Sequence, residues 1–405
     1  MKYIIVLGDG MADIAVPELG GKTPLEAAVK PNMDALASVG TVGMVQTVPT
    51  GMPPGSDTAN MSVLGFDPRV FYSGRSPLEA VALGIEVAPE DVVFRTNLVC
   101  VSDEPNYEDK TMIDFSAGEI STAEADKLIR TLQKELLTDE DLQLYPGISY
   151  RHCLVKKNGQ TGAVLTPPHD ITGKPVRGCL PEGLYAARLR LLMERSYEIL
   201  KDHPVNRARI AQGKNPANSV WFWGEGTKPK LEPLKSLYGI SGGMVCAVDL
   251  LKGLAICAGM KTVDVPGATG GMTTNYRGKG EAALKLLQDG CDLVYIHIEA
   301  PDECGHHGDA DAKVKAIEDI DRDIVGYLVK ALTNSGEPFR MLVTPDHPTP
   351  VHLMTHTGDP IPFVLYDSER RHIGPERYTE QTAKASGLFL PEGPMLMQKL
   401  ITGDF

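Results

Sequence analysis

The sequence lacks the features of membrane, nucleic-acid-binding and disulfide-stabilised proteins. No stretch of its 405 residues approaches the roughly 20 apolar residues of a membrane span, and the start, MKYIIVLGDG, has too short an apolar run for a signal peptide. It has no basic stripe with interleaved aromatics, and a formal net charge of −13 argues against nucleic acid as a partner. Its seven cysteines are odd in number and not closely paired, as in a reducing compartment. We therefore expect a cytoplasmic protein without membrane or nucleic-acid partners; its oligomeric state stays open.

The order of the expected strands and helices divides the chain into a core and an insertion. Apolar strand-like runs alternate with helical patterns near both ends, which indicates an open sheet covered by helices. In the middle, two amphipathic helices at Ser121–Leu137 and Leu184–Leu200 separate strand-like pieces. We predict a doubly wound α/β core of residues 1–92 and 217–405, with an α+β cap domain inserted at residues 93–216. The run SVWFWGEG (219–226) is expected to return the chain to the main sheet.

Acidic and imidazole side chains follow three of the expected strands. The runs Tyr3–Leu7, Val294–Ile298 and Met341–Val343 each end in such residues, and another histidine lies on the next loop. Ligands of an open parallel sheet gather where its strands end at their carboxyl edge. Each residue alone could be a turn former, a helix cap or a structural histidine, but their joint placement favours a metal site. The candidates are Asp9, Asp302, His306, Asp346, His347 and His356.

The spacing of these candidates predicts a site for two ions. Asp302 and His306 are four residues apart in a loop that contains glycine, so both can turn onto one ion. The adjacent pair Asp346 and His347 can serve a second ion. Carboxylate and imidazole together suit Mn²⁺ or Zn²⁺ better than an all-oxygen Ca²⁺ cage. Two such ions are a common device for clamping a phosphoryl group and activating a nucleophile. His297, which alternates with apolar residues in its strand, is expected to be structural.

A serine at the start of an expected helix has two interpretations. The stretch VPTGMPPGSDTANMSVLGFDP (48–68) forces an exposed turn, after which Ser56 opens a helix. Serine is a common N-cap, and on this stretch alone the cap is the favoured interpretation. Helix N-termini also bind phosphate, which would place the Ser56 oxygen beside a captured phosphoryl group.

Several motifs resemble cofactor-independent phosphoglycerate mutase of the archaeal type, a family of the alkaline phosphatase superfamily. In chain order they are GDGMAD, ELGGKTPLEAA, PNMDALA, PPGSDTANMSVLGFDP, GRSPLEA, PDECGHHGD, PDH and THTGDPIPF. The resemblance implies an alkaline-phosphatase-like fold and a phosphoryl acceptor at Ser56. It implies one ion held by Asp9, Ser56, Asp346 and His347, and another held by Asp302, His306 and His356. The ions are expected to be Mn²⁺, with Zn²⁺, Mg²⁺ or Co²⁺ as alternatives.

The implied reaction interconverts 3-phosphoglycerate and 2-phosphoglycerate through a phosphoserine, so the partner is a small phosphorylated metabolite. In the motif PPHDITGK, His169 or Asp170 could act as the base for the receiving hydroxyl. Lys279 resembles the family's active-site lysine, although a solvated lysine in a first helical turn is an equal alternative. Candidate carboxylate clamps are Arg151, Arg207 and Arg209.

The part expected to bind substrate departs from the family pattern. Where archaeal-type mutases carry an arginine-rich stretch, this chain reads TMIDFSAGEIS (111–121) and has no arginine. Both tryptophans lie in the run WFWGEG, where another arginine is expected. Two alternatives to the mutase therefore stay open: a phosphotransferase acting on a small alcohol such as homoserine, and a non-catalytic metal-binding protein.

Overall fold

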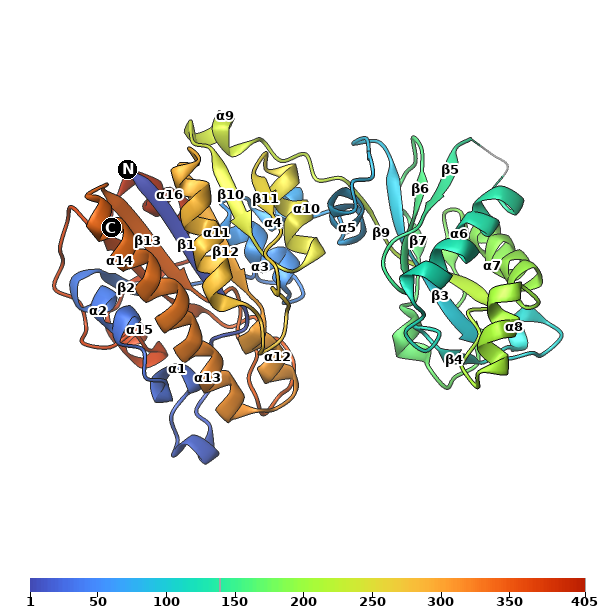
Figure 1. Cartoon of the computed structure of the whole chain (residues 1–405), viewed down its shortest axis with the longest axis horizontal. Helices are drawn as coiled ribbons and strands as arrows, with labels where there is room; N and C mark the ends of the chain where they lie inside the picture. The colour runs from blue at the N-terminus through green and yellow to red at the C-terminus, as the bar shows by residue number, and fades with distance from the viewer. Residues whose placement is uncertain (138–139, 405) are drawn as a thin grey trace. The chain divides into compact units, whose positions relative to one another are not determined.

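The computed structural model describes residues 1–137 and 140–404 and divides the chain into two compact units. The larger unit comprises Met1–Tyr72 and Leu231–Phe405, and the smaller unit comprises Ser73–Lys230 (Figure 1). The smaller unit thus begins at Ser73 rather than at residue 93, and ends at Lys230 rather than at residue 216. Within the described ranges, none of the helices has the length and hydropathy to cross a lipid bilayer.

The larger unit is built on an eight-stranded sheet. Its strands, in spatial order, are β11 (Lys261–Val263), β10 (Gly242–Val245), β12 (Leu293–Ile298), β1 (Lys2–Gly8), β13 (Phe339–Thr344), β14 (Ile361–Asp367), β2 (Thr41–Val45) and β15 (Phe389–Leu390). The strands from β11 to β13 run parallel, and β14 runs antiparallel to both of its neighbours. In the centre, Gly8 lies beside Ile298 and Leu7 beside Thr344, so three strands end at one edge.

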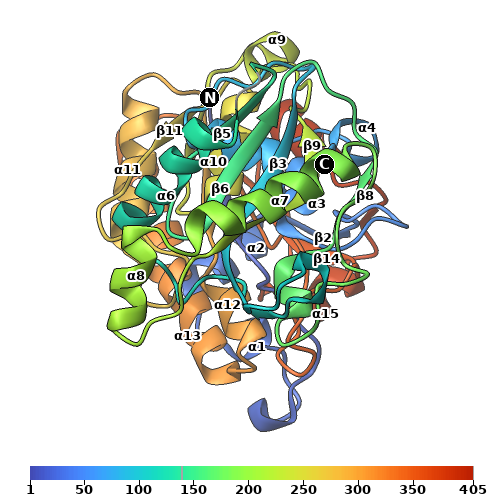
Figure 2. The same ribbon diagram turned by 90° about the vertical axis from the view of Figure 1, so that its right-hand side faces the viewer.

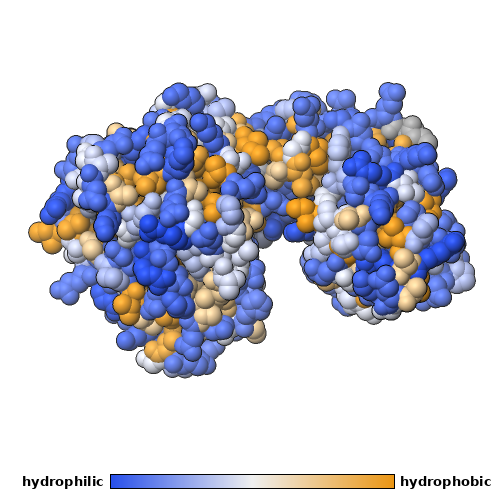
Figure 3. Space-filling view, viewed as in Figure 1, coloured by the Kyte–Doolittle hydropathy of each residue, from blue (hydrophilic) through white to orange (hydrophobic). Residues whose placement is uncertain are grey.

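Helices cover both faces of this sheet, which confirms the expected α/β class. Ile4 and Val6 of β1 pack into a core with α2 (Pro31–Val39), α11 (Tyr276–Gln288), α13 (Ala310–Ile320) and α14 (Gly326–Ser335). Successive strand residues point to opposite faces, so Ile5 and Leu7 are buried on the other side. The helices there are α3 (Ser56–Val63), α10 (Asp249–Cys257) and α16 (Met395–Thr402). The outer surface over α11, α13 and α14 is mostly hydrophilic, as amphipathic helices require (Figure 3).

Short helices complete the larger unit. They are η1 (Pro17–Leu19), α1 (Pro24–Ala27), α4 (Pro68–Phe71), α9 (Leu234–Tyr238), α12 (Ala300–His306) and α15 (Glu380–Ala385).

The smaller unit combines an antiparallel sheet with helices. Its strands are β3 (Val92–Val101), β4 (Met112–Asp114), β5 (Leu142–Tyr145), β6 (Arg151–Lys156) and β9 (Ser219–Thr227), with a separate pair of β7 (Ala163–Val164) and β8 (Glu182–Gly183). Its helices are α5 (Ser76–Ala82), η2 (Tyr107–Asp109), α6 (Thr122–Glu135), η3 (Pro168–Ile171), α7 (Ala186–Leu200) and α8 (Pro204–Ala211). Figure 2 shows α7 lying across β3 and β6 of this unit.

The prediction that SVWFWGEG returns to the main sheet is wrong. This run is β9, which pairs antiparallel with β3 from Val92 opposite Thr227 to Val99 opposite Ser219. The long partner strand satisfies the backbone groups of β9 within the smaller unit, and that unit consequently ends after the strand.

A π-helical segment, Asp321–Val325, joins α13 to α14. At its start the buried Asp321 carboxylate accepts from the backbone amides of Met33 at 2.7 Å and Asn32 at 3.2 Å. These amides belong to the first turn of α2, whose own N-cap residue, Lys30, makes no side-chain cap bond. A residue almost 290 positions away therefore caps α2.

We expect Asp321→Ala to lower the free energy of unfolding by about 1–3 kcal/mol, because the buried amide of Met33 and the half-buried amide of Asn32 lose their acceptor. The matched control is Asp323→Ala, which removes a more exposed carboxylate paired with Arg322 and should cost less than about 1 kcal/mol. Urea unfolding of both variants measures the difference. Equal losses would contradict the capping role of Asp321.

Candidate metal centre

Three buried carboxylates converge at the carboxyl edge of the central strands. Asp9 follows β1, Asp346 follows β13, and Asp302 lies in the first turn of α12 after β12. Gly10 makes this approach feasible: it has a φ of 60°, and a Cβ there would lie 2.6 Å from Asp302 Oδ1. A larger residue at this position would clash with the carboxylate, so the loop after β1 requires glycine.

Imidazoles from α12 and from the connection between β13 and β14 close the cluster, and two groups of side chains are spaced to hold an ion. Ligand atoms of Asp9, Asp346 and His347 lie within 4.8 Å of one another, as do those of Asp302, His347 and His356. His306 Nε2 lies 3.2 Å from Asp302 Oδ2 and 2.9 Å from His356 Nε2. The structure thus brings together all six acids and imidazoles that the sequence pointed to.

One local prediction about these residues is wrong. Asp302 and His306 do not lie in a loop but in α12, which spans Ala300–His306. Residues four apart in a helix lie on the same face, so the helix itself presents both side chains to one point.

Ser56 is not the cap of its helix. Gly55 occupies the N-cap of α3 and Ser56 is the first helical residue. The Ser56 hydroxyl points to the cluster instead, with Oγ 3.2 Å from Asp9 Oδ2 and 3.3 Å from His347 Nε2. The hydroxyl therefore shares its position with the ligand groups, at a helix end that favours negative charge.

The electrostatics of the cluster fit divalent cations. Burial, together with the nearby charges of Asp346 and Asp302, raises the pKa of Asp9 well above its usual value. Burial also acts to raise the pKa of Asp302, but hydrogen bonds from His306, His356 and Thr349 outweigh it and lower that pKa. The hydrogen bond to Asp302 raises the pKa of His306 to about 9. Without metal, a proton on His306 thus supplies positive charge that a cation would supply otherwise.

Neutral hydrogen-bond donors hold the carboxylates, and no sequence pattern pointed to them. Asp346 Oδ2 accepts from Asn60 Nδ2 at 2.8 Å, and Asn60 Oδ1 accepts from the Tyr295 hydroxyl at 2.6 Å. Thr349 Oγ1 donates to Asp302 Oδ1. Asn60 is one of several polar residues in α3, and Tyr295 lies in the apolar run of β12, so neither stands out in the sequence as a partner of the carboxylates.

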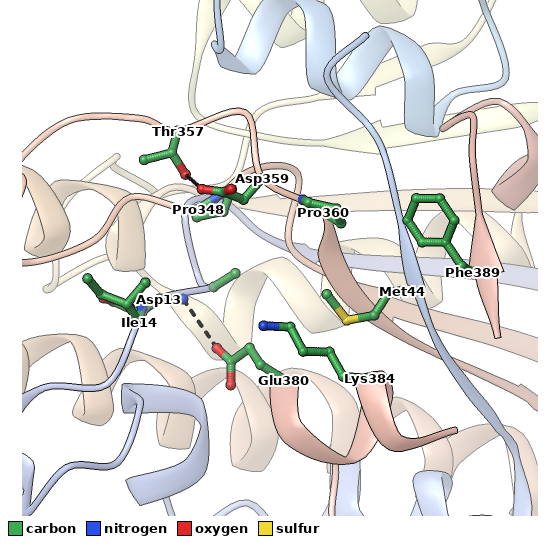
Figure 4. Close-up of a pocket in the computed structure, with 11 residues that line it drawn as sticks. Asp13, Ile14, Met44, Pro348, Thr357, Asp359, Pro360, Glu380, Lys384 and Phe389 are labelled. Carbon is green, nitrogen blue, oxygen red and sulfur yellow. Dashed lines mark hydrogen bonds between the residues drawn. The ribbon is translucent and has the colours of Figure 1, made fainter. Parts of the chain in front are cut away.

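A buried ion pair supports the loop that follows His347. Lys313 Nζ lies 2.7 Å from Asp13 Oδ2 and donates to the Thr349 carbonyl at 2.8 Å. The backbone amide of Asp13 donates to Glu380 at 3.2 Å, on the wall of a cavity of about 370 Å³. Figure 4 shows this bond and the Lys384 side chain extending into the cavity. Through Lys313 and Asp13, the loop that follows His347 is thus joined to the wall of this cavity.

Lys279 is fully buried, which rules out the solvated alternative. Its Nζ donates to the backbone carbonyl of His297 at 3.1 Å, and burial lowers its pKa to about 8. His297 in turn contacts Asp9, with Nε2 2.8 Å from Oδ2. Burial lowers the pKa of His297 to about 4, so this ring is neutral near pH 7.

The five predicted residues of the cap all lie in the smaller unit. His169 and Asp170 are exposed, with His169 Nε2 3.6 Å from Asp170 Oδ1, and Arg151 and Arg207 are exposed as well. Arg209 is buried and donates to Glu124 at 2.9 Å, to the Asn215 carbonyl at 2.9 Å and to the Ala117 carbonyl at 2.6 Å. These bonds favour a structural role for Arg209 over a carboxylate clamp.

Comparisons with known proteins agree with this geometry. A family model described as 2,3-bisphosphoglycerate-independent phosphoglycerate mutase matches residues 37–206. A Geobacter sulfurreducens protein named as a probable mutase of this kind is 48% identical over 402 residues, which cover 99% of this chain and 100% of the relative. The solved cofactor-independent phosphoglycerate mutase of Thermoplasma acidophilum is 27% identical, with a TM-score of 0.70 over 100% of both chains. A solved Pyrococcus horikoshii protein is 29% identical, with a TM-score of 0.82 over 99% of this chain and 96% of its own.

Metal loading should release a proton from His306. With a pKa of about 9, this imidazole holds a proton at pH 7 in the metal-free protein and must lose it to become a ligand. At pH 7 we expect His306 to release roughly one proton when its ion binds, and the affinity for that ion to rise between pH 7 and pH 9. Calorimetric Mn²⁺ titrations in buffers of different ionisation enthalpy measure the release.

The control for this titration is the neighbouring histidine. His306→Gln should lower the number of released protons by about one and weaken binding, whereas His307→Gln changes an exposed side chain and should leave both unchanged. Unchanged proton release in His306→Gln would contradict the assignment.

Proposed function

The chain belongs to the 2,3-bisphosphoglycerate-independent phosphoglycerate mutase family, and from this premise we propose that it interconverts 3-phosphoglycerate and 2-phosphoglycerate through a phosphoserine at Ser56. The observation that carries the proposal is the position of Ser56 Oγ, 3.2 Å from Asp9 and 3.3 Å from His347 at the start of α3. A serine that only began a helix would not need a carboxylate and an imidazole within hydrogen-bonding distance of its hydroxyl.

The donor set suits two divalent cations. We assign one ion to Asp9, Ser56, Asp346 and His347, and the other to Asp302, His306 and His356. When bound, such ions stabilise a serine alkoxide and neutralise the oxygens of a phosphoryl group. Mixed carboxylate and imidazole ligands favour Mn²⁺ as the ion, and Zn²⁺ and Co²⁺ suit the same donors.

The chain's own groups prepare Ser56 for attack. Asp9 Oδ2 is placed to accept a hydrogen bond from the hydroxyl, which orients the oxygen and favours loss of its proton. The N-terminus of α3 favours the negative charge that develops on the phosphoryl oxygens. Lys279 adds a positive charge next to the strand that carries His297.

Groups of the smaller unit supply the remaining roles in this proposal. The exposed His169 and Asp170 are candidates for the base that deprotonates the receiving hydroxyl of glycerate. Arg151 and Arg207 have free surface from which to bind the carboxylate of the substrate. A small glycolytic metabolite as substrate also agrees with a cytoplasmic enzyme.

Purified protein with Mn²⁺ should interconvert the two phosphoglycerates without added 2,3-bisphosphoglycerate. A coupled enolase assay, read at saturating metal and repeated with Zn²⁺, Co²⁺ and Mg²⁺, measures the reaction. Homoserine offered as an alternative acceptor should receive no phosphate. Inactivity with all four metals, or transfer to homoserine instead, would refute the mutase proposal.

Ser56→Ala should reduce mutase activity by at least about a thousandfold, because the attacking oxygen is lost. Mass spectrometry of wild-type protein quenched during turnover should find one phosphoryl group on the peptide that contains Ser56. The matched control is Ser62→Ala, in the same helix, whose buried hydroxyl lies outside the ligand set. Phosphate on Ser56→Ala protein would place the acceptor elsewhere.

A further inference from the structure

One fully buried histidine outside the ligand set contacts the cluster directly. His297 lies in the central strand β12, with 1% of its side chain exposed, and its Nε2 is 2.8 Å from Asp9 Oδ2. The sequence suggested only a structural role for it, because it alternates with apolar residues. The short contact with a carboxylate at the centre of the cluster gives it a more specific one.

The second ring nitrogen identifies which tautomer is present. Nδ1 of His297 is buried and has no hydrogen-bond partner among the described residues. A proton on Nδ1 would leave a buried N–H without an acceptor. It would also place the Nε2 lone pair against the Asp9 oxygen once that carboxylate is ionised, as it must be to bind a cation. With the proton on Nε2, the ring donates to Asp9 and leaves only one acceptor, Nδ1, unpaired. The surroundings therefore select the Nε2–H tautomer.

We propose that His297 is a positioning residue that fixes the Asp9 carboxylate through its Nε2–H and thereby sets which oxygen is presented to a cation. Oδ2 is held by the imidazole, and Oδ1 lies 3.6 Å from His347 Nε2 on the side of the ligand group. The inference rests on the proposed function only in taking Asp9 as a cation ligand. A carboxylate held in this way loses no rotational freedom when an ion binds.

The main chain of His297 is held as firmly as its ring. His297 lies opposite Leu7 in the parallel pairing of β12 with β1, two residues before Asp9. On the other side, the buried Lys279 Nζ donates to the His297 carbonyl at 3.1 Å. The donor ring projects from β12, and the acceptor carboxylate belongs to the residue directly after β1. The Asp9 backbone amide donates to the Ile298 carbonyl at 2.9 Å, so the edge of the sheet sets the separation of the two side chains.

The test compares two substitutions that differ in one hydrogen-bond donor. His297→Leu keeps the bulk of the side chain but removes the donor, whereas His297→Gln places an amide N–H at about the position of Nε2. Mn²⁺ binding is measured directly by electron paramagnetic resonance and calorimetry, without substrate. We expect His297→Leu to raise the Kd of one of the two sites about 10–100-fold, and His297→Gln to recover most of the loss.

A second buried strand histidine provides the control. His152 of β6, in the smaller unit, is 3% exposed and also has one ring nitrogen, Nε2, without a partner among the described residues. His152→Leu makes the same chemical change away from the carboxylates and should leave both Mn²⁺ Kd values unchanged. Equal weakening in His297→Leu and His297→Gln, or wild-type binding in His297→Leu, would overturn the inference.

A measurement on the wild-type protein decides the matter even if His297→Leu does not fold. Long-range ¹H–¹⁵N spectra of histidine-labelled protein should show His297 as the Nε2–H tautomer, with and without diamagnetic Mg²⁺. An Nδ1–H tautomer would overturn the inference. A protein that shows the expected Kd shifts but does not interconvert phosphoglycerates would refute the proposed reaction and support the role of His297.

Discussion

The structure of the larger unit depends on bringing three carboxylates together where water is excluded. Asp9, Asp302 and Asp346 are each less than a tenth exposed, and their mutual repulsion is costly in a medium of low dielectric constant. The cost is offset locally by donors: backbone amides at Gly10 and His347 for Asp346, Thr349 for Asp302, and His297 for Asp9. These donors do not neutralise the negative charge of the three carboxylates, and the remaining charge favours the binding of divalent cations.

The parallel sheet makes this concentration of charge geometrically feasible. Neighbouring strands β12, β1 and β13 are in register, so the residues that follow them arrive at one edge. Ser56 reaches the same point from α3, which also carries Asn60 to Asp346. One helix thus delivers both the hydroxyl and a group that orients a ligand, so a shift of α3 would disturb both together.

Two fully buried lysines stand behind the cluster from different helices. Lys313 of α13 pairs with Asp13 and holds the Thr349 carbonyl, while Lys279 of α11 holds the His297 carbonyl. Each lysine bonds to the main-chain carbonyl of a residue, Thr349 or His297, whose side chain contacts a candidate ligand. Rigid support of this kind keeps ligands in place before the ion arrives, which is how a binding site reaches high affinity without reorganisation.

The sequence by itself determined the α/β class, the strands that end in acids and imidazoles, and the helix that begins near Ser56, because periodicity and turn residues are local signals. Tertiary structure decided the rest. The pairing of β9 with β3, the capping of α2 by Asp321 and the bonds of His297, Asn60 and Lys313 all join residues far apart in the chain. A buried polar side chain within an apolar pattern does not reveal its partner, since the partner is chosen by packing and by the need to satisfy every buried donor and acceptor.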